Sequence, residues 1–88
     1  MYNFINAQEM QTRYPDTFEA PTLTALNSIS IGQSVKVCHK NERFWVSVTS
    51  IHKDVISGTV DNSLVLKHPF KFGDIIQFKK HHIYAIWD

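Results

Sequence analysis

One nine-residue pattern occurs twice in this sequence, as Ile-Ser-Ile-Gly-Gln-Ser-Val-Lys-Val at 29–37 and as Phe-Lys-Phe-Gly-Asp-Ile-Ile-Gln-Phe at 70–78. In each copy, apolar and polar residues alternate on both sides of a glycine. This alternation is typical of half-buried strands, and the glycine lets the chain turn a corner. The repeat therefore predicts a small β-barrel or curled sheet, an architecture that serves unrelated functions.

Length and charge limit the possibilities further. A chain of 88 residues supplies one domain with a modest core, and 43% hydrophobic residues are typical of a globular protein. The formal net charge of +1 gives no bulk attraction to nucleic acid, so binding to a polyanion would require a local basic patch.

The chain carries few signals for a particular compartment. Its single cysteine, Cys38, cannot form an internal disulfide, and the first residues lack a basic segment followed by an apolar run. Nowhere do about 18 consecutive apolar residues occur, so no membrane span is expected. We therefore expect a reduced, cytoplasmic protein.

Residues 1–28 are expected to form a helical leader to the domain. Asn6 can cap a helix that ends before Pro15, and Thr22 can cap a second helix of about two turns that ends by Ser28. Helices this short are unstable alone, so their apolar residues must dock on the sheet. The residues expected to dock are Phe4, Ile5, Met10, Tyr14 and Phe18.

Residues 29–88 are expected to form the β-rich body. Alternation predicts five strands, at 35–38, 43–52, 56–60, 76–78 and 83–87, with turns at 39–42 and 53–54 and a polar tip at 79–82. The predicted fold class is α+β and mainly β. Its expected form is an SH3-like five-stranded β-barrel or curled antiparallel sheet, with one or two short N-terminal helices.

The second predicted strand separates its side chains into two sets. Phe44, Val46 and Val48 share one face, and Trp45 points to the other unless a β-bulge intervenes. An outward tryptophan has two readings. It can be a binding platform, or it can cover the sheet beneath the helical leader by packing against Leu23, Leu26 or Phe18.

Part of the body resembles a known family. The segments Glu-Arg-Phe-Trp-Val-Ser-Val-Thr at 42–49, Gly-Thr-Val-Asp-Asn at 58–62 and Phe-Gly-Asp at 72–74, followed by Phe78 and Ile83-Tyr84, are similar to bacterial DUF2314 domains. The similarity covers roughly residues 29–88. It implies a small β-rich fold and no catalytic residue, because this family has no established activity.

The residues offer little support for catalysis, metal binding or a cofactor. A zinc site needs three or four converging ligands, and Cys38 and His39 are neighbours that should face opposite sides of a strand. A thiol in mid-strand is usually packed and inert. Gly32 and Gly73 stand alone, without the further glycines of a phosphate-binding loop. The five histidines are therefore expected to be surface residues: His39, His52, His68, His81 and His82.

Several polar residues admit either a structural or a binding role. Glu42 and Arg43 could meet a charged ligand, although such a pair at a hairpin is usually a solvated turn or a local ion pair. Asn62 follows a strand, where it could present polar groups or close its own turn. Asp74 and its repeat counterpart Gln33 are expected to fix the two glycine corners.

We expect a non-catalytic binding module, monomeric or weakly dimeric, whose partner is a protein or peptide. The alternative ligand is a nucleotide or single-stranded nucleic acid such as RNA, stacked on the tryptophan with its phosphates on nearby basic residues. The candidate ligand-binding residues are Arg43, Trp45, Asn62, Lys79, Lys80 and His82.

Overall fold

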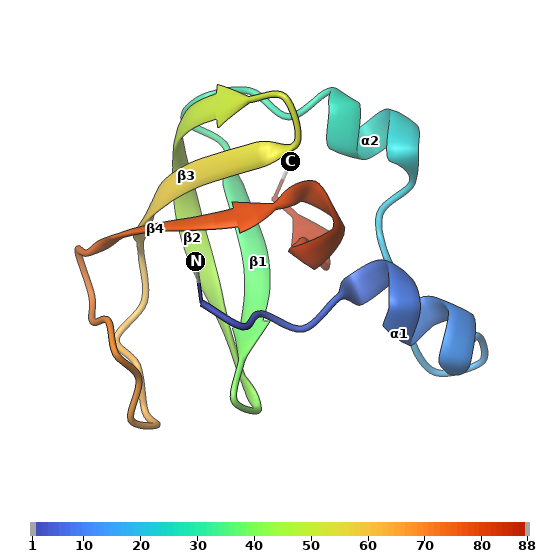
Figure 1. Cartoon of the computed structure of the whole chain (residues 1–88), viewed down its shortest axis with the longest axis horizontal. Coiled ribbons are helices and arrows are strands. Elements are labelled where there is room, and N and C mark those ends of the chain that lie inside the picture. The colour runs from blue at the N-terminus through green and yellow to red at the C-terminus, as the bar shows by residue number, and fades with distance from the viewer. Residues whose placement is uncertain (1, 88) are drawn as a thin grey trace.

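The computed structural model describes residues 2–87, which form one antiparallel sheet flanked by two short helices (Figure 1). The elements in chain order are α1 (Ala7–Arg13), α2 (Leu23–Asn27), β1 (Ser34–His39), β2 (Glu42–His52), β3 (Val55–Val60), β4 (Ile75–Lys79), the 3₁₀ turn η1 (Lys80–His82) and β5 (Ala85–Ile86).

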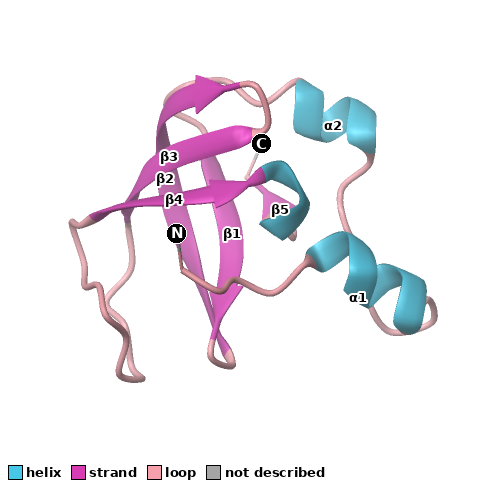
Figure 2. Ribbon diagram, in the orientation of Figure 1, coloured by secondary structure: helices cyan, strands magenta, loops and turns pink. Residues whose placement is uncertain are grey.

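The five strands lie in the order β4-β3-β2-β1-β5, and each neighbouring pair is antiparallel (Figure 2). Within residues 2–87, β4 and β5 form the two edges and are not paired with each other. The molecule is therefore mainly β, and the sheet is curled without closing into a barrel. No helix in this part of the chain is long and apolar enough to cross a bilayer.

The two glycine patterns form the same corner, as predicted. Gly32 has φ 94° and Gly73 has φ 89°, a left-handed conformation that favours glycine. At each corner the side chain after the glycine, Gln33 or Asp74, accepts a hydrogen bond of 3.0 Å from the backbone N–H three residues earlier. A neutral amide and a carboxylate accept the equivalent hydrogen bond, which supports a structural role for Asp74.

The first hairpin is tighter than the sequence suggested. The β1–β2 turn contains two residues, Lys40 (φ 48°) and Asn41 (φ 68°), so both strands extend into the predicted 39–42 turn. Two consecutive left-handed residues match the twist of the flanking strands. The β2–β3 turn lies at 53–54 as expected, and a bulge shifts the β2–β3 register between Val48 and Ser50.

The core is formed by the inward residues of β1 to β4. Its largest fully buried side chains are Phe44 and Phe78, each at most 1% exposed. Aromatic and aliphatic residues from the loops and the helical leader complete it. The remaining core residues are Phe4, Leu26, Ile29, Val35, Val37, Val46, Val48, Ile56, Val60, Phe70, Ile76 and Ile83.

The helical leader docks through fewer residues than predicted. Both predicted caps are confirmed, because Asn6 accepts from the Glu9 N–H and Thr22 from the Ala25 N–H. Phe4 is buried with the core. The prediction was wrong for Ile5 and Tyr14, which are 38% and 51% exposed. Helices this short expose most of their surface, so one or two buried side chains are enough to attach each part of the leader to the sheet.

The C-terminal segment also differs from the prediction. Residues 79–82 are not a hairpin tip, because 80–82 form η1, closed by the Ile83 N–H bonding to the Lys80 carbonyl at 3.1 Å. The predicted strand at 83–87 is regular only over the two residues of β5. Ile83 is fully buried and turns the chain inward before β5 reaches the edge of β1.

Gly58 offers a test of the packing between β2 and β3. A Cβ atom at this position would collide with Val46 Cγ1 and lie 2.7 Å from the Ser47 carbonyl oxygen. We expect Gly58→Ala to destabilise the protein by about 1–3 kcal/mol in urea unfolding, since the core must shift to admit a methyl group. Thr59→Ala, on the opposite face of β3, is the matched control. Equal stabilities of the two variants would contradict this account.

Candidate functional site

An aromatic and cationic surface lies on the outer side of β1 and β2 beside the C-terminal segment. We call it the aromatic face; its members are Lys36, Arg43, Trp45, Tyr84 and Trp87. Lys36 pairs with Trp45 across β1 and β2. The Tyr84 N–H donates to the Lys36 carbonyl at 3.0 Å, and the Trp87 N–H donates to the Ser34 carbonyl at 2.9 Å. The backbone of β1 thus holds the C-terminal aromatic residues beside those of β2.

The rings and cations of the aromatic face contact one another. Trp45 and Trp87 meet nearly at right angles, with 5.4 Å between ring centroids. Lys36 Nζ lies 4.8 Å from the Trp45 ring centroid, and Arg43 Cζ lies 4.7 Å from that of Tyr84. Trp87 remains 64% exposed. The face therefore presents free indole surface beside two positive charges.

Trp45 points outward, as the alternation of β2 predicted. Its ring contacts are Trp87 and Lys36. The leader residue Phe18 instead packs against Tyr84, with 5.2 Å between centroids. Asn62 accepts a hydrogen bond from the Trp45 N–H, so its side chain ties the backbone after β3 to β2. This bond gives Asn62 a structural role, although the side chain binds β2 and not its own turn as considered.

The predicted basic residues of the C-terminal segment lie elsewhere. The Lys80 ammonium group donates to Asn27 Oδ1 at 3.1 Å, which places it against α2. His82 Nδ1 accepts from the Lys79 N–H at 3.0 Å, and its ring lies 5.9 Å from that of Phe4. Burial, and then the nearby His81, lower the pKa of His82 to about 4. The six predicted residues therefore do not form one site, and His82 is neutral at pH 7.

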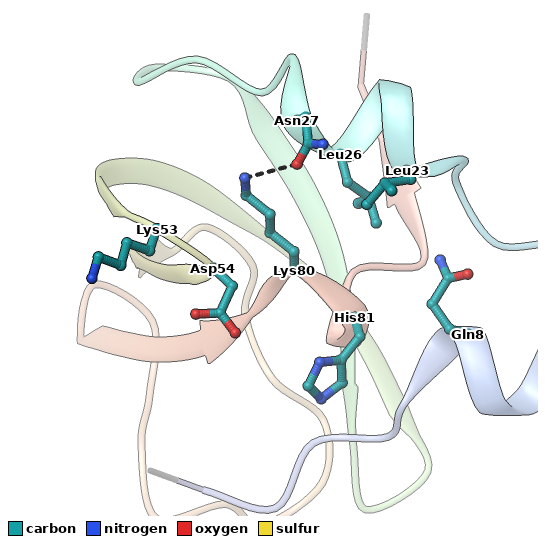
Figure 3. Close-up of a pocket in the computed structure, with 8 residues that line it drawn as sticks. All are labelled: Gln8, Leu23, Leu26, Asn27, Lys53, Asp54, Lys80 and His81. Carbon is teal, nitrogen blue, oxygen red and sulfur yellow. Dashed lines mark hydrogen bonds between the residues drawn. The ribbon is translucent and has the colours of Figure 1, made fainter.

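An open pocket of about 650 Å³ lies where the helical leader meets η1 (Figure 3). Leu23 and Leu26 point into it from α2, and Gln8 approaches from α1 (Figure 3). Lys80 and Asp54 bound the opposite side. Remaining lining residues are Asn27, Lys53 and His81. Only Lys80 of the predicted binding residues belongs to this pocket.

Three ionisable side chains form a hydrogen-bonded chain beside the turn of the β1–β2 hairpin. His39 Nδ1 lies 2.7 Å from His68 Nδ1, and His68 Nε2 lies 2.8 Å from Glu42 Oε1. The prediction of surface histidines was wrong for these two, since His39 is 4% exposed and the His68 side chain is fully buried. An ionised carboxylate only accepts, so His68 donates from Nε2 to Glu42.

Glu42 also fastens the loop at 61–74. Its two carboxylate oxygens accept from the Val65 N–H at 2.8 Å and the Leu66 N–H at 2.7 Å. The Val65 N–H contributes most to lowering the pKa of Glu42 to about 2, followed by the His68 side chain and the Leu66 N–H. Burial and the neighbouring His68 lower the pKa of His39. A hairpin glutamate gave no sequence signal for this role, because its partners lie more than 20 residues away.

Cys38 lies beneath a smaller cavity of about 210 Å³ between the leader and the aromatic face. Burial raises the pKa of its thiol above the usual value, although the nearby Arg43 opposes this shift. A protonated, buried thiol is a poor nucleophile. Between residues 2 and 87, no three His, Cys, Asp or Glu side chains are placed to hold a metal ion.

No protein-family model, curated protein or solved structure matches this chain.

Replacing Glu42 tests how the loop at 61–74 is held. The pKa of Glu42 falls from 4.5 to about 2 in the folded protein. Its stabilising contribution is therefore complete above about pH 4.5 and is lost as the pH falls toward 2. We expect Glu42→Gln to lower the urea midpoint of unfolding at pH 7. The midpoint of this variant should change less than that of the wild type between pH 4.5 and 2. Amide hydrogen exchange at Val65 and Leu66 should become faster.

Glu19→Gln is the matched control, because Glu19 is an exposed carboxylate of the leader. Unchanged exchange at Val65 and Leu66 in Glu42→Gln would show that the carboxylate does not hold the loop.

Proposed function

We propose that this protein is a non-catalytic binding module that holds an extended segment of a partner protein on its aromatic face. The proposal rests on the nearly perpendicular Trp45–Trp87 pair, of which Trp87 is 64% exposed, flanked by Lys36 and Arg43. Tryptophan and arginine are enriched among residues that dominate protein interfaces. A tryptophan side chain has only two rotatable bonds, so it loses little conformational freedom when it binds.

The geometry favours an extended peptide with acidic residues. Two indoles in contact at nearly right angles provide aromatic surface in two orientations, which suits a proline-rich segment. Lys36 and Arg43 are both fixed above aromatic rings, where they can meet carboxylates beside that segment. A near-neutral net charge of +1 suits such a partner better than a polyanion.

A nucleotide or single-stranded RNA is the second candidate ligand. It is supported by Lys36 and Arg43 beside exposed aromatic surface, since bases stack on aromatic rings while cations meet phosphates. It is weakened by the positions of Lys80 and His82, which lie against α2 and Phe4. Lys36 and Arg43 are therefore the two cations of the aromatic face that could meet phosphate groups.

We propose that the protein is not an enzyme, and the state of its nucleophilic and basic side chains supports this. The buried Cys38 thiol has a raised pKa, and the His39, His68 and Glu42 side chains bind one another in a buried chain. We also propose a cytoplasmic location, an SH3-like relationship of the curled sheet and membership in the DUF2314 domains. These rest on the five strands, the single cysteine and the sequence segments described above.

Truncating the exposed indole tests the proposal. The probe is a fluorescent proline-rich peptide that carries two glutamate residues, titrated with the protein and followed by anisotropy. We expect Trp87→Ser to weaken peptide binding by about tenfold or more, as for an aromatic hot spot, while the urea midpoint changes little. Phe72→Ser is the matched control, because Phe72 is 61% exposed outside the aromatic face.

A second titration uses labelled oligouridine. Saturable binding of oligouridine that Trp87→Ser abolishes, with no binding of the peptide, would replace the peptide proposal by the nucleic-acid one. Failure of both probes to perturb amide signals of Lys36, Arg43 and Trp45 would remove the aromatic face as a site.

A further inference from the structure

We propose that the pocket between the helical leader and η1 is a second binding site, which takes a medium-chain alkyl carboxylate. This proposal is independent of the aromatic face, since the two sites share no residue. The pocket volume of about 650 Å³ lies within the range of small-molecule sites. Its ligand class follows from an apolar wall and an ammonium group at the end of that wall.

The apolar wall comes from α2. Leu23 is 72% exposed although it points into the pocket, whereas Leu26 is anchored in the core at 3% (Figure 3). A helix of five residues is too short to be stable alone, so an apolar ligand against this wall would also support α2. An alkyl chain matches this wall without burying polar groups that would lack partners.

The charged side of the pocket favours an anion. The Lys80 ammonium group is held over the pocket by Asn27 Oδ1 at 3.1 Å, which uses one of its three donors (Figure 3). Lys53 and Asp54 lie in the β2–β3 turn, and the Lys80 N–H donates to the Asp54 carbonyl at 2.9 Å. In Figure 3 the Lys53 side chain points away from the pocket. Of the two lysines that line the pocket, Lys80 is therefore the one that can offer its charge to an anion, with the Asp54 carboxylate as the neighbouring negative charge.

The Lys80 ammonium group lies beside Asn27 at the end of α2, and Leu23 lies at the start of this helix, which sets the ligand's orientation. Its carboxylate is expected to meet the ammonium group at the rim, and its alkyl chain to run across Leu23 and Leu26 toward Gln8. Each buried methylene group then adds to affinity until the chain fills the pocket. Asp54 opposes the anion, so the two charged residues have opposite expected effects on binding.

A chain-length series on the full protein tests this inference, with sodium hexanoate, octanoate and decanoate below their micelle concentrations. Amide shifts in NMR spectra are expected in residues 23–27, 53–54 and 80–81. Affinity is expected to rise about fourfold per added methylene group. Octylammonium and octanol are expected to bind about tenfold more weakly than octanoate. Octylammonium binding as tightly as octanoate, or affinity independent of chain length, would overturn the proposal.

Paired variants separate the roles of the lining residues. We expect Lys80→Gln to weaken octanoate binding by about tenfold and Asp54→Asn to strengthen it. Leu23→Ser is expected to weaken binding without unfolding, because Leu23 is exposed; Leu66→Ser, 48% exposed outside the pocket, is its control. No saturable shift in these residues with wild-type protein would overturn the proposal. Trp87→Ser should leave octanoate binding unchanged, so the two proposals can fail independently.

Discussion

The pairing of β2 with a strand on each side is the constraint on which the rest of this structure depends. β2 has 11 residues, and its inward set of Phe44, Val46 and Val48 is almost completely buried. Because side chains alternate strictly along a strand, burying these three places Arg43 and Trp45 on the outer surface. A one-residue slip would exchange the two sets, so the core that stabilises the fold also fixes the aromatic face.

The long β3–β4 connection is ordered by polar contacts as well as apolar ones. Residues 61–74 contain no helix or strand, and a segment of this length needs specific anchors. The loop places Phe70 in the core, while the Glu42 carboxylate binds Val65, Leu66 and His68. Such charge-assisted bonds are stronger than neutral ones, and here they replace a regular hydrogen-bond ladder.

The helical leader and the sheet create their binding surfaces by different means. The aromatic face comes from strand alternation in β1 and β2 and from the backbone bonds that hold Tyr84 and Trp87 beside β1. The pocket exists because α2, anchored by Leu26, stands away from η1 and leaves Leu23 uncovered. Such short helices gain their stability from docking, so the pocket belongs to a part of the molecule whose stability can respond to a ligand.

The sequence by itself determined the elements that follow local rules. Period-two alternation located the strands, Asn6 and Thr22 marked the helix starts, and the two glycine patterns marked equivalent corners. The outward position of Trp45 followed from the same alternation. Tertiary structure alone decided which distant residues meet: Trp45 with Trp87, Glu42 with His68, and Lys80 with Asn27. Local propensity encodes backbone conformation over a few residues, whereas these contacts depend on how the sheet curls and where the loops return.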